Sequence, residues 1–273
     1  MGLCGRIPEA DKNGGRPVKS VDLNADLGEG FGPWTMGDDP AMLDIVSTAN
    51  IACGAHAGDP RTMRETVALA RARGVAIGAH PGYADLAGFG RRPMPGITLT
   101  EVENLVAYQV GAFAGICALE GHPATHVKTH GALGNACADD DDMASAVARA
   151  IRAVDPGLAF MVMPGMATAR AAEKFGLTPF NEIYADRTYA PGFNLTPRSQ
   201  PDAMIHDVGI ALQRILETME AGRLVATDGS YLDVTVDSIC VHGDNPGAVQ
   251  MAAELRRCLT EAGYAIKSSL ASG

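Results

Sequence analysis

Residues 74–83 have the sequence GVAIGAHPGY, an apolar run that ends at His80 and is followed at once by Pro81 and Gly82. An apolar run that ends in a polar residue and a glycine turn is typical of a buried parallel strand where it reaches a functional rim. Three further runs have the same form, and they are NIACGAHAGD at 50–59 with His56, THVKTHGAL at 125–133 with His130, and SICVHGDNPG at 238–247 with His242. Several strand ends of this kind indicate one shared polar site, which in a barrel of alternating strands and helices is where chemistry takes place. The sequence therefore predicts an enzyme.

The rest of the chain alternates between strand-like and helix-like segments, which predicts a parallel α/β architecture. Strands are expected near residues 18–24, 48–53, 74–80, 124–130, 158–163, 180–185 and 237–242. Helices are expected from Asp59-Pro60 to Gly74, from a capping box at Thr100 and Glu103 to Gly121, after the acidic run 139–142, from Pro201 to Gly222, and from Asn245-Pro246 to Gly263. We expect a single barrel domain over residues 18–273 and a disordered extension over residues 1–17.

Composition argues against several classes of protein. The formal net charge of −10 leaves no basic stripe to neutralise phosphates, so a nucleic-acid-binding protein is not expected. No apolar run of about 18 residues is present, so no membrane span is expected, and residues 1–20 lack the apolar stretch of a signal peptide. The six cysteines are scattered without a C-x-x-C pair, as is typical of free thiols in a reducing compartment. These features predict a cytoplasmic protein.

The segment VDLNADLGEG at residues 21–30 has the most concentrated polar pattern. Asp22, Asn24 and Asp26 alternate with apolar residues at the end of a predicted strand, so their side chains share one face. Buried carboxylates are costly without partners, which favours a functional trio inside the barrel, with Glu29 in the following turn. The alternative is a strand edge that faces water, with Asp26 as a helix cap.

His56 and His80 are the candidate acid–base or ligand residues at the next two strand ends. An imidazole can bind a metal or act as a general acid or base, and with Asp22 or Asp26 these two would form an Asp/His/His set. Closely spaced histidines occur in one other place, and they are His122, His126 and His130. That segment has the pattern of a turn and a strand, so helical metal-ligand spacing does not apply. We therefore assign no tightly bound metal from the sequence, and an Asp/His/His metal site stays an alternative.

Cationic residues occur at two further strand ends. Lys128 and His130 alternate on one face of an apolar-flanked strand, and an inward lysine there suits a carboxylate or phosphate. Asp186 and Arg187 follow the run NEIYA, where an arginine can clamp a planar anion through two hydrogen bonds. The alternatives are a solvent-facing salt bridge for the lysine and a structural Asp–Arg pair that holds the loop.

Two segments border the same predicted rim. The last strand ends at His242 and Asp244, which are candidate binding residues, while Asn245 is expected to cap the next helix. Residues 82–98 form a long loop rich in glycine and proline, of the kind that acts as a lid or binding loop. No P-loop, dinucleotide G-x-G-x-x-G or G-x-S-x-G elbow is present. The residues alone thus predict a barrel-like hydrolase or transferase with an Asp/His/Lys/Arg site.

Six ordered motifs add a family resemblance. They are DLNADLGEGFGPW, NIACGAHAGDP, IGAHPGYADLAGFGRR, VKTHGALGN, ADRTYAPGFNLTPR and CVHGDNPGAV, from Val21 to the last helix. In this order they resemble the LamB/YcsF family, whose characterised bacterial members are A subunits of ATP-dependent 5-oxoprolinase. The resemblance implies an irregular (β/α)₇ TIM-like barrel related to the glycoside hydrolase/deacetylase group. It also implies ATP-driven opening of the 5-oxo-L-proline lactam to L-glutamate, with Mg²⁺ accompanying ATP and with two partner subunits, PxpB and PxpC.

Three positions depart from the family pattern. Ala25, Thr129 and Gly134 stand where the family usually has cysteine, proline and tyrosine. Ala25 is expected to point away from the polar trio, whereas Gly134 is expected to alter the pocket wall.

These arguments assign roles to two sets of residues. The expected catalytic residues are Asp22, Asp26, His56, His80, Lys128 and His130. The expected substrate or ATP contacts are Asn24, Glu29, Asp186, Arg187, His242 and Asp244. One alternative function is a metal-dependent deacetylase or amidohydrolase that uses an Asp/His/His site without ATP. Another is a non-catalytic barrel that serves as a binding module for a second protein.

Overall fold

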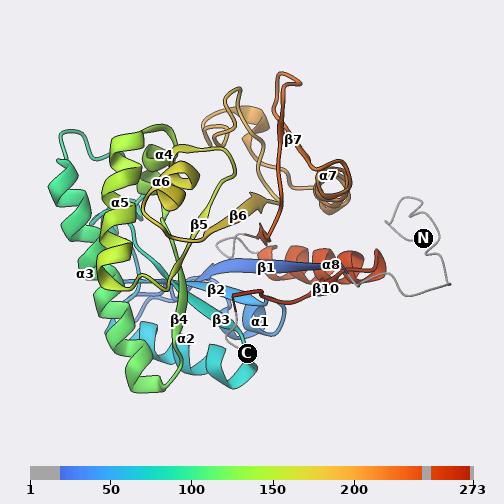
Figure 1. Cartoon of the computed structure of the whole chain (residues 1–273). Coiled ribbons are helices and arrows are strands. Elements are labelled where there is room, and N and C mark those ends of the chain that lie inside the picture. Colours follow the sequence, from blue (N-terminus) through green and yellow to red (C-terminus); the bar gives the residue numbers. More distant parts are fainter. Residues whose placement is uncertain (1–18, 242–246, 271–273) are drawn as a thin grey trace.

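A computed structural model describes residues 19–241 and 247–270. Seven parallel strands close into a barrel, as predicted (Figure 1). They are β1 (Ser20–Leu27), β2 (Thr48–Ala52), β3 (Ala76–His80), β4 (Ala124–Lys128), β5 (Ala159–Val162), β6 (Pro179–Tyr184) and β9 (Ser238–Cys240). The barrel closes because β9 pairs in parallel with both β6 and β1. Each of the seven predicted strands corresponds to one of these.

The alternation of β1 places polar and apolar side chains on opposite faces of the barrel wall. Leu23, Ala25 and Leu27 belong to the hydrophobic core. Asn24 and Asp26 instead make hydrogen bonds and ion pairs to strands across the barrel interior. Ala25 therefore points away from the polar residues, as expected. Every residue of β2 and of β3 is buried, which is the burial expected for parallel strands covered on both faces.

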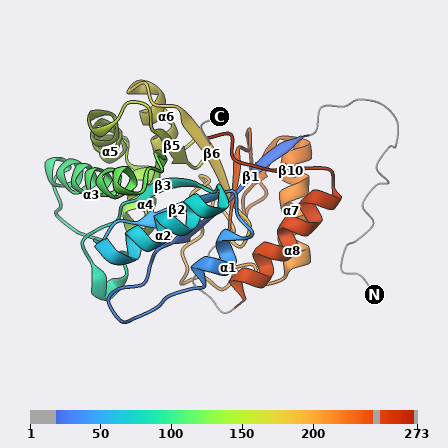
Figure 2. The same cartoon turned by 90° about the horizontal axis from the view of Figure 1, so that it is seen from below.

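Eight helices surround the barrel in the described part of the chain. They are α1 (Asp39–Leu43), α2 (Pro60–Arg73), α3 (Leu99–Glu120), α4 (Gly131–Asp139), α5 (Asp141–Val154), α6 (Ala167–Lys174), α7 (Val208–Ala221) and α8 (Ala248–Glu261). Successive neighbours α1, α2, α3, α5 and α6 contact one another, and α8 contacts both α7 and α1. Seen from below, α3 and α5 lie on one side, α7 and α8 lie on the opposite side, and α1 and α2 lie between them (Figure 2).

Two helices begin later or earlier than predicted. The capping box of α3 is formed by Thr98 and Glu101, so the prediction of Thr100 and Glu103 was wrong by two residues. Both pairs fit the pattern, but only the earlier start places Ile97 just before the cap as an apolar staple. The predicted helix from Pro201 is a short 3₁₀ turn, Pro201–Ala203, followed by extended chain that pairs with the loop after β6. The α-helix begins only after the Asp207 cap.

Other helix boundaries agree with the sequence. Asp59 caps α2 through its carboxylate, and Gly74 ends that helix in the left-handed region. Gly121 and Gly222 end α3 and α7 in the same way. Asp140, within the acidic run, caps α5. The predicted opening of the last helix at Asn245-Pro246 lies outside the described residues, as does the predicted 1–17 extension.

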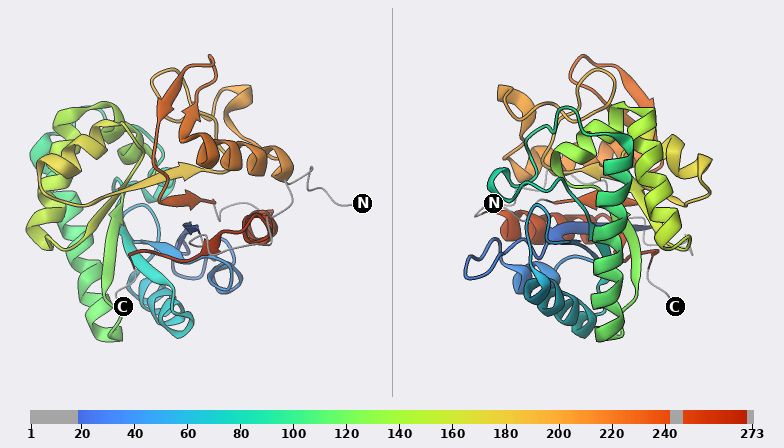
Figure 3. Two further views of the ribbon diagram at one scale, coloured as in Figure 1. Left: turned by 45° about the vertical axis from the view of Figure 1, so that its right-hand side comes forward. Right: turned by 90° about the vertical axis from the view of Figure 1, so that its left-hand side faces the viewer.

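Three short strands were not predicted. β7 (Arg223–Val225) and β8 (Tyr231–Asp233) form an antiparallel hairpin that stands beside the barrel on the α7 side (Figure 3). β10 (Ala265–Ile266) extends the sheet along β1. The hairpin contacts the barrel rim, because the amide of Thr227 donates to the carbonyl of Tyr189.

The structure confirms the expectation of free thiols, but it contains one helix that the sequence analysis did not count as a possible membrane span. The five described cysteines are buried and unpaired, as expected. Helix α3 is long and apolar enough to cross a membrane by length and composition, which the sequence analysis did not anticipate. However, Val102, Val106, Val110 and Phe113 of α3 are buried against the hydrophobic core. One face of α3 thus packs in the helical layer of the barrel.

Candidate active site

The carboxyl ends of the strands open into one cavity of about 580 Å³. This volume lies within the usual range for small-molecule sites. The cavity is lined by acidic, histidine and lysine side chains from the strand ends, and they are Asp26, Glu29, His80, Lys128, His130 and Glu182. Three arginines, Arg91, Arg187 and Arg198, also line it. The site is therefore polar, charged and placed where barrel enzymes carry their chemistry.

Lys128 forms the centre of a buried ion cluster. It is the last residue of β4, only 3% of it is exposed, and its Nζ lies 3.0 Å from Asp26 Oδ1 and 2.9 Å from Glu182 Oε1. The Tyr184 ring lies 5.2 Å from the same Nζ. Burial lowers the Lys128 pKa, but the neighbouring carboxylates outweigh it and hold the pKa well above its usual range. Lys128 is thus a permanent cation that is already met by two carboxylates.

A layer of neutral hydrogen bonds supports this cluster from below. Asn50 Nδ2 donates to Asn24 Oδ1 at 2.8 Å and to Asp26 Oδ1 at 2.9 Å. His126 Nε2 in turn donates to Asn50 Oδ1 at 2.7 Å. Burial is the main cause that lowers the His126 pKa to about 3, so its imidazole is neutral at physiological pH. Asp26 is therefore held in one orientation by a chain of fixed amide and imidazole groups.

Asp22 lies lower in the barrel and is not among the described residues that line the cavity. Its carboxylate accepts hydrogen bonds from the hydroxyls of Ser47 and Thr48, each at 2.6 Å, and of Ser238. Burial raises its pKa, and these hydroxyl donors oppose the rise. Three hydroxyls near the start of β1 thus bind both oxygens of Asp22, and its catalytic role stays a prediction.

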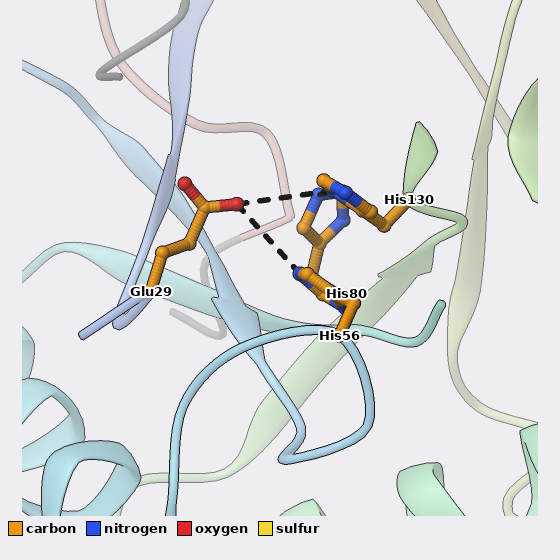
Figure 4. Close-up of side chains that lie close together, drawn as sticks. All are labelled: Glu29, His56, His80 and His130. Atoms are coloured by element: carbon orange, nitrogen blue, oxygen red, sulfur yellow. Dashed lines mark hydrogen bonds and ion pairs between the residues drawn. The ribbon is translucent and has the colours of Figure 1, made fainter. Parts of the chain in front are cut away.

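His56, His80 and His130 gather with Glu29 at one wall of the cavity (Figure 4). The rings of His56 and His130 are stacked at 3.7 Å between centroids, and His80 meets both edge-on. Glu29 Oε1 lies 3.7 Å from His56 Nε2 and 3.8 Å from His130 Nδ1. The prediction that these three histidines lie together is confirmed, but only His80 and His130 line the cavity, since His56 is not among the described residues that line it.

Backbone carbonyls determine which nitrogen of two of these rings carries the proton. His80 Nδ1 donates to the carbonyl of Lys128 at 2.8 Å, and His130 Nε2 donates to the carbonyl of Phe89 at 2.8 Å. A carbonyl oxygen only accepts, so the remaining nitrogens, His80 Nε2 and His130 Nδ1, have lone pairs when the rings are neutral. These two atoms face each other at 3.0 Å. Burial lowers the pKa of His130 to about 3 and that of His56 well below its usual value.

The loop at residues 82–98 lies against the histidines. Phe89 contacts the edges of the His56 and His130 rings. A side chain on Gly90, whose φ is +61°, would meet His56 Cβ at 2.7 Å, so the backbone approaches the rings closely here. Arg91 from the same loop lines the cavity. The loop predicted as a lid or binding loop therefore builds one wall of the site.

Arg187 holds the loop that follows β6. Its Nε donates to the carbonyl of Ala203 at 3.2 Å and its Nη2 donates to that of Thr196 at 2.6 Å. Burial lowers its pKa. Two of the N–H groups predicted to bind an anion thus bind loop carbonyls instead, although Arg187 still lines the cavity. Asp186 is buried but is not among the described lining residues.

The remaining expectations have mixed outcomes. His242 and Asp244 lie outside the described residues. The family departures Thr129 and Gly134 both line the cavity, and a side chain on Gly134 would meet the Thr129 carbonyl at 2.8 Å. The two departures are thus in contact on the same wall.

Sequence reasoning missed Glu182, Tyr184 and Asn50. Glu182 and Tyr184 alternate with Ile183 in β6, which is the same period-two signal that identified the polar residues of β1. Asn50 stands within a fully buried strand, where a polar side chain requires a partner. Both signals were present in the sequence.

This fold and site define a class: a (β/α) barrel with a buried acidic and histidine-rich centre at the carboxyl ends of its strands. The chain belongs to the LamB/YcsF family, whose model matches residues 21–272. It is 52% identical over 249 residues to the A subunit of 5-oxoprolinase from Azorhizobium caulinodans, covering 91% of this chain and 98% of the relative. It is 51% identical over 246 residues to the corresponding 5-oxoprolinase chain from Rhodopseudomonas palustris, covering 90% and 97%.

Solved structures agree with the barrel. The lactam utilization protein from Thermus thermophilus superposes with a TM-score of 0.85 at 42% identity, covering 91% of this chain and 99% of that one. The catalytic domain of a peptidoglycan N-acetylglucosamine deacetylase from Eubacterium rectale has a TM-score of 0.51 at 10% identity, with 97% and 95% covered. The second likeness shows a shared fold and no more.

Proposed function

We propose that this chain is the A subunit of an ATP-dependent 5-oxoprolinase, which opens the lactam of 5-oxo-L-proline to L-glutamate. The observation that carries the proposal is the 52% identity to a relative of that name along 98% of its length. The cavity supports it, since cationic arginines and buried carboxylates suit a small anionic substrate and its hydrolysis. Family members named in this way are hydrolases of a cyclic amide.

The chemistry explains why ATP is required. A lactam carbonyl is a poor electrophile because the ring nitrogen donates electrons into it. Transfer of the γ-phosphoryl group to the lactam oxygen makes that carbon reactive, and attack by water then breaks the C–N bond. The first water thus opens the ring to an acyl phosphate, and a second water hydrolyses that acyl phosphate, so the products are glutamate, ADP and phosphate. Mg²⁺ would offset the charge on the transferred phosphoryl.

Asp26 is the residue best placed to accept the proton of the attacking water. Lys128 and Asn50 hold its Oδ1, while Oδ2 lies toward His80 and the cavity. A carboxylate held in this way keeps its charge and orientation. Arg91 and Arg198, which also line the cavity, are suited to the substrate carboxylate or to the phosphoryl group.

We further propose that PxpB and PxpC complete the enzyme with this chain. The names of the curated relatives describe one chain of a larger enzyme, which supports an assembly of several chains. The deacetylase alternative has less support, since the deacetylase likeness is confined to the fold at 10% identity. Whether this chain binds ATP by itself is tested separately, by equilibrium dialysis of the isolated chain against the nucleotide.

The test is reconstitution of the three subunits with 5-oxoproline, ATP and Mg²⁺, measuring glutamate and ADP together. We expect stoichiometric release of both, and neither product when this chain is omitted. Asp26→Asn should abolish glutamate formation, while the matched control Asp142→Asn, an exposed aspartate in the first turn of α5, should retain it. Full activity without this chain, or activity of Asp26→Asn equal to that of the control, would refute the assignment.

A further inference from the structure

We propose that Glu29, His56, His80 and His130 form a binding site for one transition-metal ion of the Zn²⁺ type. One potential ligand atom from each residue lies within 4.8 Å of the others, and all four side chains are buried. The proposal rests on this geometry and not on the proposed reaction, and it is tested without ATP or 5-oxoproline.

The strongest observation is the pair of facing lone pairs. His80 Nε2 and His130 Nδ1 are 3.0 Å apart, and each ring already donates its one N–H to a backbone carbonyl. Two acceptor nitrogens at this distance repel unless a cation lies between them, either a proton or a metal ion. Metal-binding histidines usually donate their second nitrogen to a carbonyl in this way, which orients the ring. The carbonyls of Lys128 and Phe89 occupy those positions here.

The distances suit a small coordination shell. With Zn–N bonds of 2.0–2.1 Å, tetrahedral ligand atoms are about 3.3 Å apart. The pair His80–His130 is close to this at 3.0 Å, and Glu29 Oε1 lies 3.8 Å from His130 Nδ1. A shift of about half an ångström in the flexible Glu29 side chain closes that side of the shell.

His56 supplies an independent observation. Only 1% of it is exposed, and neither of its ring nitrogens has a hydrogen-bond partner within the described chain. Unpartnered buried nitrogens are costly, and they indicate a ligand. Because the ring is parallel to that of His130, an ion in the plane of one lies outside the plane of the other. His56 therefore binds the ion only after its ring turns, which makes it the weaker ligand.

Donor chemistry and access define the class of ion. Three imidazoles and one carboxylate match Zn²⁺, Co²⁺, Ni²⁺ or Fe²⁺, whereas Mg²⁺ prefers oxygen ligands and retains water. Glu29, His80 and His130 all line the cavity, so an ion can reach the site.

The test is metal binding by the full chain after removal of metals with a chelator. We expect one Zn²⁺ or Co²⁺ per chain after dialysis, measured by mass spectrometry of the metal, and visible absorption bands of low-symmetry Co²⁺. His80→Gln and His130→Gln should each lose the ion and the bands, and His56→Gln should weaken binding to a smaller degree. The matched control His206→Gln, an exposed histidine outside the site, should bind as the wild type does.

A second measurement does not depend on variants that fold. Zn²⁺ should raise the Tm of the wild-type chain, and the rise should grow with the logarithm of its free concentration above Kd. The chelator should reverse the rise, because an ion that binds only the folded state stabilises it. Nitrogen NMR of the histidines should show a metal on His80 Nε2 and His130 Nδ1. A proton shared by these atoms that Zn²⁺ does not displace would overturn the proposal. Equal binding by His130→Gln and His206→Gln, or binding of Mg²⁺ alone, would also overturn it.

Discussion

Replacement of Lys128 by methionine tests the charge balance of the site directly. The change keeps the length of the apolar stem but removes a cation that contacts Asp26 Oδ1 at 3.0 Å and Glu182 Oε1 at 2.9 Å. With an effective dielectric constant of 20, each contact is worth about 5.5 kcal/mol of attraction before desolvation is subtracted. The sequence alone favoured a lysine that serves a bound anion, whereas the structure supplies two carboxylates as its partners.

The variant should be less stable for a second reason. Both carboxylates contact the same Nζ, so they are no more than about 6 Å apart, and without the lysine they repel by about 3 kcal/mol. Loss of one member of a buried ion cluster typically costs about 3–5 kcal/mol. For a chain of this size the Tm should fall by roughly 6–20 °C, measured by calorimetry at pH 8.

The pH dependence and a second substitution identify the cause. In Lys128→Met, one of the two carboxylates takes up a proton on folding, so lower pH favours the folded state and the loss of Tm should shrink from pH 8 to pH 5. Lys128→Met/Glu182→Gln should recover part of the Tm, because it removes one of the repelling charges. The control Lys267→Met, at an exposed lysine, should leave the Tm unchanged. A folded Lys128→Met chain with the Tm of wild type at pH 8 would refute this account.

Three further predictions concern pH, packing and the metal cofactor of ATP. His126→Gln should make the free energy of unfolding less sensitive to acid. Burial holds the folded-state pKa of His126 near 3, so the wild-type chain has the full contribution of the neutral ring above pH 6.5 and loses it as the pH falls toward 3. By pH 4 the loss should reach up to about 3 kcal/mol, measured by denaturant unfolding. Gly78→Ala should lose about 1–3 kcal/mol of unfolding free energy because the new Cβ overlaps the His126 ring, whereas Gly111→Ala on α3 meets no atom within 4 Å and should be neutral or stabilising; equal values for the two would contradict this. ADP release coupled to 5-oxoproline should require Mg²⁺ in the reconstituted enzyme, and full activity in excess chelator would count against that requirement.

The strands of the barrel were predictable because their signals are local. An apolar run, a polar end and a glycine turn occupy neighbouring positions, so His56, His80 and His130 could be assigned to strand ends before any tertiary contact was known. Where two local signals overlap, the sequence does not choose between them. Thr98 with Glu101 and Thr100 with Glu103 both fit the capping-box pattern, but only the first pair forms the box, with Ile97 directly before it packed against the core.

The partners of each polar residue were less predictable because they depend on register across the barrel. Glu182 lies 54 positions from Lys128 along the chain, and only the pairing of β6 through β5 with β4 brings them together. The same limitation applies to Asp22, since its hydroxyl partners come from the starts of β2 and β9 and from the residue before β2. A period-two pattern shows which face of the strand a carboxylate occupies. It does not show how deep in the barrel the carboxylate lies or which side chains bind it there.

Asp22 and Asp26 of β1 lie at different depths in the barrel, and only Asp26 lines the cavity. Asp22 and Asp26 share a face, and at about 3.3 Å per residue they lie some 13 Å apart. At the lower level three hydroxyls bind the Asp22 oxygens. At the middle level Asn24 makes hydrogen bonds with the neutral side chains of Ser238 and Asn50, and it accepts a longer one from Lys128 at 3.4 Å. At the upper level Asp26 has charged partners and borders the cavity. Toward the strand ends, the partners of these β1 side chains thus change from neutral hydroxyls and amides to charged groups beside the cavity. Because Asp26 borders the cavity and Asp22 does not, we expect Asp26 and not Asp22 to be the reactive carboxylate.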